Sequence, residues 1–160
     1  MIDLEKIKQK LLKGYQHEDI IKKFNWKEFE GFIAEIFRNN HFFVKQNFVF
    51  KTKNRYEIDL VAVSNRYVLC IDCKEWNRGR YKKSGLKKAA NKQEKRVGEF
   101  RKFLKKNLIA NKMLNTSQKS RFYSLIVTLF EEELLKENNT IIVPAWKLNS
   151  FLLDLDNYLA

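Results

Sequence analysis

Three β-rich segments follow one another with very little chain between them, and this arrangement constrains the fold more than any other feature of the sequence. Residues 42–51, 56–63 and 67–74 are rich in aromatic and β-branched side chains, which is typical of strands. The last two are joined by the turn-like segment 64–66. Consecutive strands with short connections usually pair as neighbours, so the sequence predicts a β-meander in the first half of the chain.

Helical patterns flank the meander on both sides. Before it, apolar spacing predicts helices over residues 3–13, 19–24 and 25–39, the last with Asn25 as N-cap and Glu28 as its capping-box partner. After it, the pattern predicts a basic helix over 86–108, strands over 122–130 and 141–144, and an amphipathic helix over 148–159. The charged stretch 131–139 is expected to be a loop or a short helix. This order predicts an α/β fold with a mixed central sheet flanked by helices.

Length and composition favour one domain over residues 1–160. The chain is 44% hydrophobic, with one Pro and five Gly, and no linker-like or repeated segment interrupts it. We expect residues 1–24 to form a helical extension and residues 25–160 to form the core. The charged start and the longest apolar run, at 125–130, fit neither a signal peptide nor a membrane span, so the expected protein is cytoplasmic, with no membrane partner.

The two cysteines form a C-x-x-C pattern, which could indicate redox or zinc chemistry. Cys70 and Cys73 both fall inside the third β-rich segment, where positions three apart point to opposite faces of a sheet. No second cysteine pair exists, and His17 and His41 are the only histidines. We therefore expect two buried, reduced thiols.

Positive charge is concentrated in one segment. Residues 78–106 contain thirteen Lys and Arg against Glu94 and Glu99, so this segment carries +11 of the net charge of +13. A localised basic surface suits a polyanion, because each neutralised phosphate releases condensed counterions. Nucleic acid is the expected partner, and a solvated Lys-rich helix is the alternative. A membrane surface is disfavoured because the segment lacks a broad apolar face.

One acidic residue of the helix at 25–39 lies beside its apolar stripe. At about 100° per residue, Glu30 falls about 40° from Trp26, close to the direction of Ile33 and Phe37. An acid at the edge of a core needs a partner or a function. An ion pair with Lys or Arg is the structural explanation, and a place in a catalytic centre is the functional one.

Two more acids interrupt the second and third β-rich segments. Asp59 stands in a run that is otherwise apolar on both faces, while Asp72 and Lys74 share a face of the next segment. A connection of two or four residues brings Asp59 opposite Cys70 or Asp72 on that face. A three-residue connection without a bulge would turn Asp59 to the other face.

Neighbouring carboxylates are costly to bury unless a cation joins them, so this cluster is a candidate for a divalent metal ion. Oxygen ligation without a useful His or Cys favours Mg²⁺ or Mn²⁺ over zinc. Lys74, two residues beyond Asp72, could orient or activate the attacking water and stabilise negative charge developing on phosphorus. Together these features predict phosphodiester hydrolysis.

In combination, segments 29–37, 56–62 and 70–74 resemble the PD-(D/E)xK nuclease superfamily, especially its archaeal Holliday junction resolvase and Mrr-like restriction branches. The resemblance covers about residues 25–108, and the thirteen-residue separation of Asp59 and Asp72 is similar to that of the resolvases. It implies a restriction-endonuclease-like αβββαβ core. Ile58 stands where the proline of the motif often stands, and Asp72 where Glu is commoner.

The resemblance also implies a role for each candidate residue. Glu30 matches the helix acid, Asp59 the metal-binding aspartate, Asp72 the acid of the (D/E)xK element, and Lys74 its lysine. The backbone carbonyl of Cys73 is expected near the metal ion. Gln93 matches a glutamine that some branches place near the active site, although a hydrogen-bonded core amide explains it equally well.

The function implied is that of a Mg²⁺- or Mn²⁺-dependent endonuclease acting on DNA. Candidate backbone contacts come from the basic segment and are Arg78, Arg80, Lys82, Lys83, Lys87, Lys88, Lys92, Lys95 and Arg96, with Trp76 and Tyr81 as candidates for stacking. RNA as substrate, one or two metal ions, and restriction-type or branched-structure cleavage all stay open. A homodimer is expected from the resemblance alone. The competing hypothesis is a nucleic-acid-binding module of the same fold without turnover.

Overall fold

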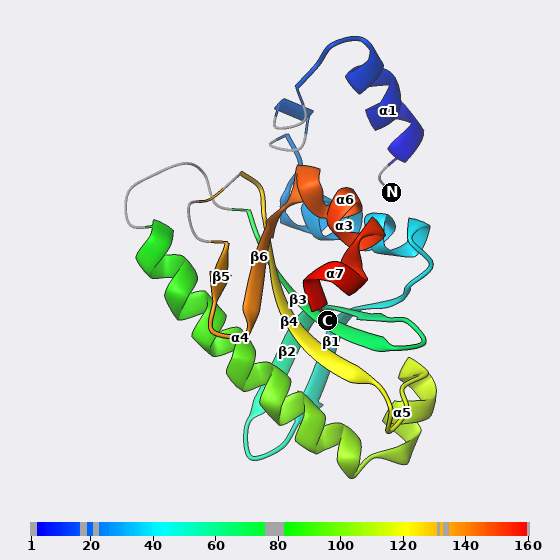
Figure 1. Cartoon of the computed structure of the whole chain (residues 1–160), viewed down its shortest axis with the longest axis vertical. Coiled ribbons are helices and arrows are strands. Elements are labelled where there is room, and N and C mark those ends of the chain that lie inside the picture. Colours follow the sequence, from blue (N-terminus) through cyan, green and yellow to red (C-terminus); the bar gives the residue numbers. More distant parts are fainter. Residues whose placement is uncertain are drawn as a thin grey trace.

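The protein is a mixed α/β structure built on one six-stranded sheet with helices on both faces (Figure 1). A computed structural model describes residues 3–16, 19–20, 23–75, 82–130, 132 and 135–159. The strand order is β1-β2-β3-β4-β6-β5. The strands are β1 (Phe43–Lys51), β2 (Arg55–Val63), β3 (Tyr67–Lys74), β4 (Arg121–Thr128), β5 (Lys136–Glu137) and β6 (Thr140–Pro144). The predicted fold class is confirmed.

Strand pairing follows directly from the connections. The short connections pair β1 with β2 and β2 with β3 in antiparallel fashion, as the predicted meander requires. The strands β3 and β4 are parallel, and the chain between them passes through a long helix. Parallel neighbours need a crossover connection of this kind. β4 and β6 are also parallel, and β5 adds antiparallel to β6 at the edge.

Two layers of helices cover the sheet. One layer contains α3 (Trp26–Asn39), α6 (Leu148–Leu153) and α7 (Leu155–Leu159), whose apolar residues pack with β3 and β4. The other contains α4 (Lys82–Lys105) and α5 (Leu108–Leu114). The remaining helices are α1 (Leu4–Leu12), which lies at the N-terminal end of the chain, and the 3-10 turn η1 (Ala145–Lys147) (Figure 1).

Local sequence signals fix several helix ends. The predicted capping box is present, because Asn25 Oδ1 accepts from Glu28 N–H at 2.9 Å and Glu28 Oε2 accepts from Asn25 N–H at 2.8 Å. Asp3 caps α1 through its side chain alone, which accepts from the N–H groups of Glu5 and Lys6. Of the short helix expected over 19–24, residues 19 and 20 are helical, 23 and 24 form a turn and a bend, and the rest lies outside the described residues.

Three predicted elements were wrong in extent. The basic helix begins at Lys82 and ends at Lys105, and Asn107 then caps a separate α5 through Ala110 N–H at 2.9 Å. The stretch 131–139, expected to be a loop or a short helix, contains the two-residue strand β5 among its described residues. The C-terminal helix is divided at Asp154, whose carboxylate accepts a hydrogen bond from Asn157. The division between α4 and α5 occurs where the Asn107 side chain offers the backbone a local hydrogen-bond partner.

No helix in the described part of the chain combines the length and apolar character that a membrane span requires.

The α4 layer should depend strongly on Phe100. Its ring is fully buried and lies 5.4 Å from the rings of both Phe48 and Phe50, measured between centroids. Phe100→Ala removes these contacts and leaves a cavity, so we expect the free energy of unfolding to fall by about 3–5 kcal/mol. Denaturant titration measures this, with Leu153→Ala as control, since Leu153 is 74% exposed and its loss should change stability little. Similar losses in both variants would contradict this packing.

The predicted buried thiols are present, since Cys70 and Cys73 are both free and fully buried. Burial also raises the pKa of each thiol above its ordinary value. Neither cysteine should therefore react with an aromatic disulfide reagent in the folded protein, whereas both should react after denaturation. Rapid reaction of either thiol under native conditions would contradict the packing of β3.

Candidate metal centre and nucleic-acid interface

The candidate site forms where β2 separates from β3. The β2–β3 ladder runs from the pair Val63 and Val68 to the pair Leu60 and Ile71, and then stops. Continuing the same register would pair Ile58 with Cys73. Instead, Asp59 Oδ2 accepts a hydrogen bond from Cys73 N–H at 2.9 Å. The carboxylate of Asp59 therefore occupies the end of the ladder, in the place of a backbone acceptor.

The connection between β2 and β3 brings two of the predicted acids together. Four residues, 64–67, separate the paired Val63 and Val68. A connection of two or four residues is needed to place Asp59 on the same face as Asp72, and the observed connection meets this requirement. The register then places Asp59 beside Asp72. Asp72 is 3% exposed and Asp59 is half-buried, so both carboxylates are largely removed from water.

Burial and crowding make this pair electrostatically unfavourable without a cation. Burial raises the pKa of Asp59 to about 6, the hydrogen bond from Cys73 lowers it, and the neighbouring Asp72 raises it again. These are the effects expected when two carboxylates share a partly desolvated space. The arrangement consequently attracts positive charge.

Two basic side chains supply part of that charge. Lys74 Nζ lies 3.1 Å from Asp72 Oδ2, and Arg96 Nη1 lies 3.8 Å from Asp72 Oδ1. Lys74 comes from the same strand as Asp72, two residues later, as the D-x-K pattern predicts, and its side chain is 20% exposed. Arg96 comes from α4, which crosses this face of the sheet. Its place beside Asp72 was not predicted from the sequence, which assigned Arg96 only to the basic surface.

Glu30 is the third predicted acid, and it approaches from the α3 layer. It is 3% exposed. Burial raises the pKa of Glu30 to about 7, with further increases from the charges of Asp59, Glu57 and Asp72, while a hydrogen bond with the Trp26 side chain lowers it. Glu30 is thus within electrostatic reach of the aspartates. The half-exposed Trp26, which helps to hold it, is a site residue that the sequence used only as a marker of the helix face.

The three acids do not by themselves enclose a metal ion. In the chain segments that the structure describes, no group of three or more His, Cys, Asp and Glu side chains is arranged to hold one. That Glu30 binds a metal ion directly together with Asp59 and Asp72 stays a prediction. Its position fits a supporting electrostatic role.

The backbone of Cys73 offers a further oxygen atom at the same place. Lys74 C=O accepts from Leu129 N–H on the β4 side of β3. Because successive residues of a strand direct their backbone groups to opposite edges, both the N–H and the C=O of Cys73 point toward β2 and the Asp59 carboxylate. Two carboxylates and a carbonyl form an oxygen donor set, which fits Mg²⁺ or Mn²⁺.

Gln93 supports the site from behind rather than lining it. The residue is fully buried; its Nε2 donates to Cys70 O at 3.0 Å and its Oε1 accepts from Arg96 Nη1 at 2.9 Å. These bonds fix the guanidinium of Arg96 near Asp72. Gln93 is therefore a hydrogen-bonded core amide, one of the two explanations considered from the sequence, and its role in an active site stays a prediction.

The described part of the predicted basic surface lies on α4. Its exposed residues are Lys83, Lys87, Lys88, Lys92 and Lys95, and Arg96 is half-buried. Lys88, Lys92 and Arg96 follow one another at intervals of four residues and so lie on one side of the helix. We term these three residues the acid-side row, because the last of them, Arg96, contacts Asp72. Arg78, Arg80, Trp76 and Tyr81 lie outside the described residues, as does the side chain of Lys82.

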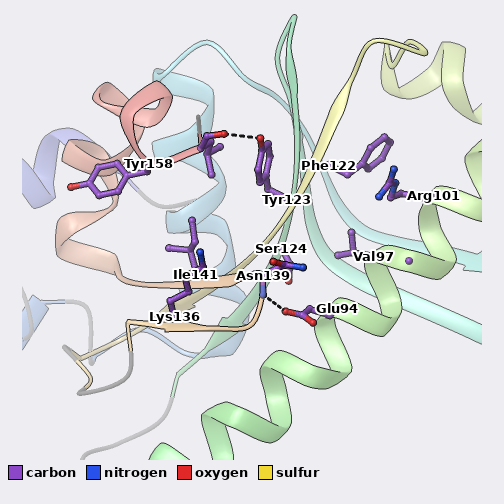
Figure 2. A pocket seen from close by; sticks show the side chains of 12 residues that line it. Glu94, Val97, Arg101, Phe122, Tyr123, Ser124, Lys136, Asn139, Ile141 and Tyr158 are labelled. Atoms are coloured by element: carbon purple, nitrogen blue, oxygen red, sulfur yellow. Dashed lines mark hydrogen bonds between the residues drawn. The ribbon is translucent and has the colours of Figure 1, made fainter.

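A separate cavity of about 430 Å³ opens on the other side of α4 (Figure 2). It lies beside the first residues of β4, with Arg101 and Phe122 on its wall, and Glu94 there accepts from Asn139 N–H at 2.6 Å. None of the acids discussed above lines it. The candidate acids and this cavity are therefore in different places.

Two comparisons of sequence relate this chain to other proteins. The model of the nuclease-related domain family matches residues 13–129. A protein from Archaeoglobus fulgidus, described as uncharacterized, is 35% identical over 136 residues, which are 84% of this chain and 95% of the relative.

Among solved structures, VC1899 from Vibrio cholerae is similar with a TM-score of 0.42 and 12% identity, over 84% of this chain and 34% of that protein. A protein of unknown function, AF1548, is similar with a TM-score of 0.36 and 18% identity, over 76% of this chain and 51% of that one. The chain thus spans about a third and about half of these two proteins, and likenesses this distant support no argument about function. The family match is different, because it includes α3, the meander and α4: this chain belongs to the nuclease-related domain family.

Proposed function

We propose that this protein is a metal-dependent nuclease of the PD-(D/E)xK kind that hydrolyses phosphodiester bonds in DNA. The observation that carries the proposal is the meeting of Asp59 and Asp72 at the end of the β2–β3 ladder, with Lys74 Nζ 3.1 Å from Asp72. Two acids and a lysine in this arrangement suit hydrolysis at a phosphate, since the acids recruit a cation and the lysine remains to act on the substrate.

Asp59, Asp72 and the Cys73 carbonyl would hold Mg²⁺ or Mn²⁺. Bound there, the ion supplies Lewis acidity at the scissile phosphate. The raised pKa of Asp59 supports this assignment, because it reflects negative charge that is buried without enough compensation. Glu30 adds negative potential from α3.

Lys74 and Arg96 have different parts in the reaction. Lys74 is partly exposed, so its ammonium group can orient the attacking water and stabilise the charge that develops on the phosphoryl oxygens. Arg96 is held by Gln93 and stabilises Asp72 from the α4 side. The acid-side row continues from Arg96 to Lys92 and Lys88, so a phosphate backbone that follows these residues reaches the aspartates.

One observation favours a second candidate, a nucleic-acid-binding module without turnover. Asp72 already has two cationic neighbours, Lys74 and Arg96, and such a network can stabilise a buried acid without any metal ion. Binding to nucleic acid would then depend on the basic surface of α4 alone. In either case a homodimer, expected only from the resemblance, would present two such surfaces to one duplex.

The first test is cleavage of plasmid and branched DNA, and of RNA, in Mg²⁺, Mn²⁺ or EDTA. We expect DNA cleavage only with a divalent metal ion, and a loss of about 100-fold or more in Asp72→Asn and in Lys74→Met, since each removes a charge used in the transition state. Glu5→Gln, an exposed position on α1, is the matched control and should cut like the wild type.

Thermal melting of each variant confirms that the loss is not unfolding. Salt-sensitive binding without cleavage in any metal would replace the nuclease by the binding module. Preferential cleavage of RNA would keep the chemistry and change the substrate.

The second test concerns the acid-side row. We expect Lys88→Gln/Lys92→Gln to weaken DNA binding and to reduce the slope of log K against log salt by about 2, because two phosphate contacts are lost. Lys112→Gln/Lys119→Gln removes the same charge from exposed positions outside α4 and should leave the slope nearer its wild-type value. Fluorescence anisotropy over a range of salt concentrations measures both, and equal slopes for the two double variants would reject α4 as the main phosphate contact.

A further inference from the structure

A left-handed residue interrupts β1 directly beside the candidate site. Asn47 has φ 51°, and of the four non-glycine residues with positive φ in the described chain it alone lies within a strand; His41, Asn115 and Asn138 lie in turns. L-residues seldom adopt this conformation, and Asn tolerates it better than most. Its occurrence in the middle of a nine-residue strand therefore requires an explanation.

Asn47 lies opposite Asp59. In the β1–β2 ladder, Gln46 pairs with Leu60 and Phe48 pairs with Ile58, and the pair between them, Asn47 with Asp59, is missing. Asp59 is also the first residue of β2 beyond the β2–β3 ladder. The backbone irregularity of β1 and the separation of β2 from β3 thus occur at the same level of the sheet.

Both strands change the face that they bury at this level. Residues two apart normally share a face of a sheet. On β2, however, Leu60 packs in the α3 layer and Ile58 in the α4 layer. On β1, Val44 packs in the α3 layer and Phe48 in the α4 layer, although a regular strand would put them on one side.

We propose that Asn47 is a positioning residue for Asp59. Its left-handed backbone lets β1 reverse its buried face, β2 follows by pairing on either side of it, and Asp59 is thereby turned out of both ladders so that its carboxylate reaches Cys73 N–H. The side chain of Asn47 is exposed, so the conformation of the residue, rather than a buried contact, accounts for this role. The catalytic consequence rests on the proposed function, whereas the effect on Asp59 does not.

Three substitutions of Asn47 distinguish the effect of its backbone conformation from the effect of its side chain. Asn47→Gly keeps access to the left-handed region, and Asn47→Val opposes it because a β-branched side chain favours extended backbone. Asn47→Ala is a milder form of the same change and replaces the Val variant if that protein does not fold. Asn115→Val makes the matched change at another left-handed Asn, at the end of α5.

The direct readout is the Cys73 amide, whose proton bonds to Asp59. In amide NMR spectra, we expect Asn47→Val or Asn47→Ala to shift this resonance and to speed its hydrogen exchange, while Asn47→Gly and Asn115→Val leave it unchanged. In the cleavage assay, the same Val or Ala variant should lose about 10- to 100-fold in kcat/KM, and Asn47→Gly should retain the wild-type value.

The outcomes separate the two proposals. An unchanged Cys73 amide in both Asn47→Val and Asn47→Ala would overturn the positioning role, as would an equal perturbation in Asn47→Gly, since the side chain would then be responsible. If the amide responds as expected while the wild type cuts nothing in any metal, the positioning role stands and the proposed nuclease activity fails.

Discussion

The pairing of β2 with β3 ends at Leu60 and Ile71, and the hydrogen bond from Cys73 N–H to Asp59 takes the place of the next backbone contact. A buried N–H without a partner is costly, so this bond stabilises the end of the ladder. It also fixes a carboxylate where a backbone carbonyl would otherwise lie. Because the acceptor is a side chain, β2 can move away from β3 beyond this point without leaving the Cys73 N–H unsatisfied.

A carboxylate in the place of a backbone carbonyl adds negative charge next to Asp72, and the surrounding residues compensate this charge in part. Asp59 and Asp72 are close and partly desolvated, and the pKa of Asp59 is raised, first by burial. Arg96 and Lys74 approach Asp72 from different elements, and Gln93 holds the guanidinium of Arg96. Removing one cation from such a cluster leaves the carboxylates poorly compensated. The basic α4 is consequently part of the site itself and not merely a surface beside it, which explains why a buried polar Gln93 interrupts its apolar side.

Much of this could be predicted from residue patterns, because the patterns are local. The capping box at Asn25 and the strand alternation around Asp72 involve neighbours within a few residues, and both are confirmed. The site geometry required one further fact, the four-residue connection before Val68. Other features depend on the backbone conformation of individual residues, which the pattern of apolar and polar residues does not encode. Asn47 resembles any exposed polar residue of a strand, so alternation predicts no change of face there, and apolar spacing likewise does not predict the break at Asp154.

The position of Asp59 is determined by apolar burial as much as by its own hydrogen bond. Leu60 and Ala62 on one side of it fill the α3 layer, while Ile58 fills the α4 layer beside Phe48 and Phe100. A slip of one residue in β2 would move all of these side chains to the wrong layer, at a cost far above that of one polar contact. The acid is therefore held at the only level where the strand passes from one core to the other, and a rigid placement of this kind is what a catalytic carboxylate requires.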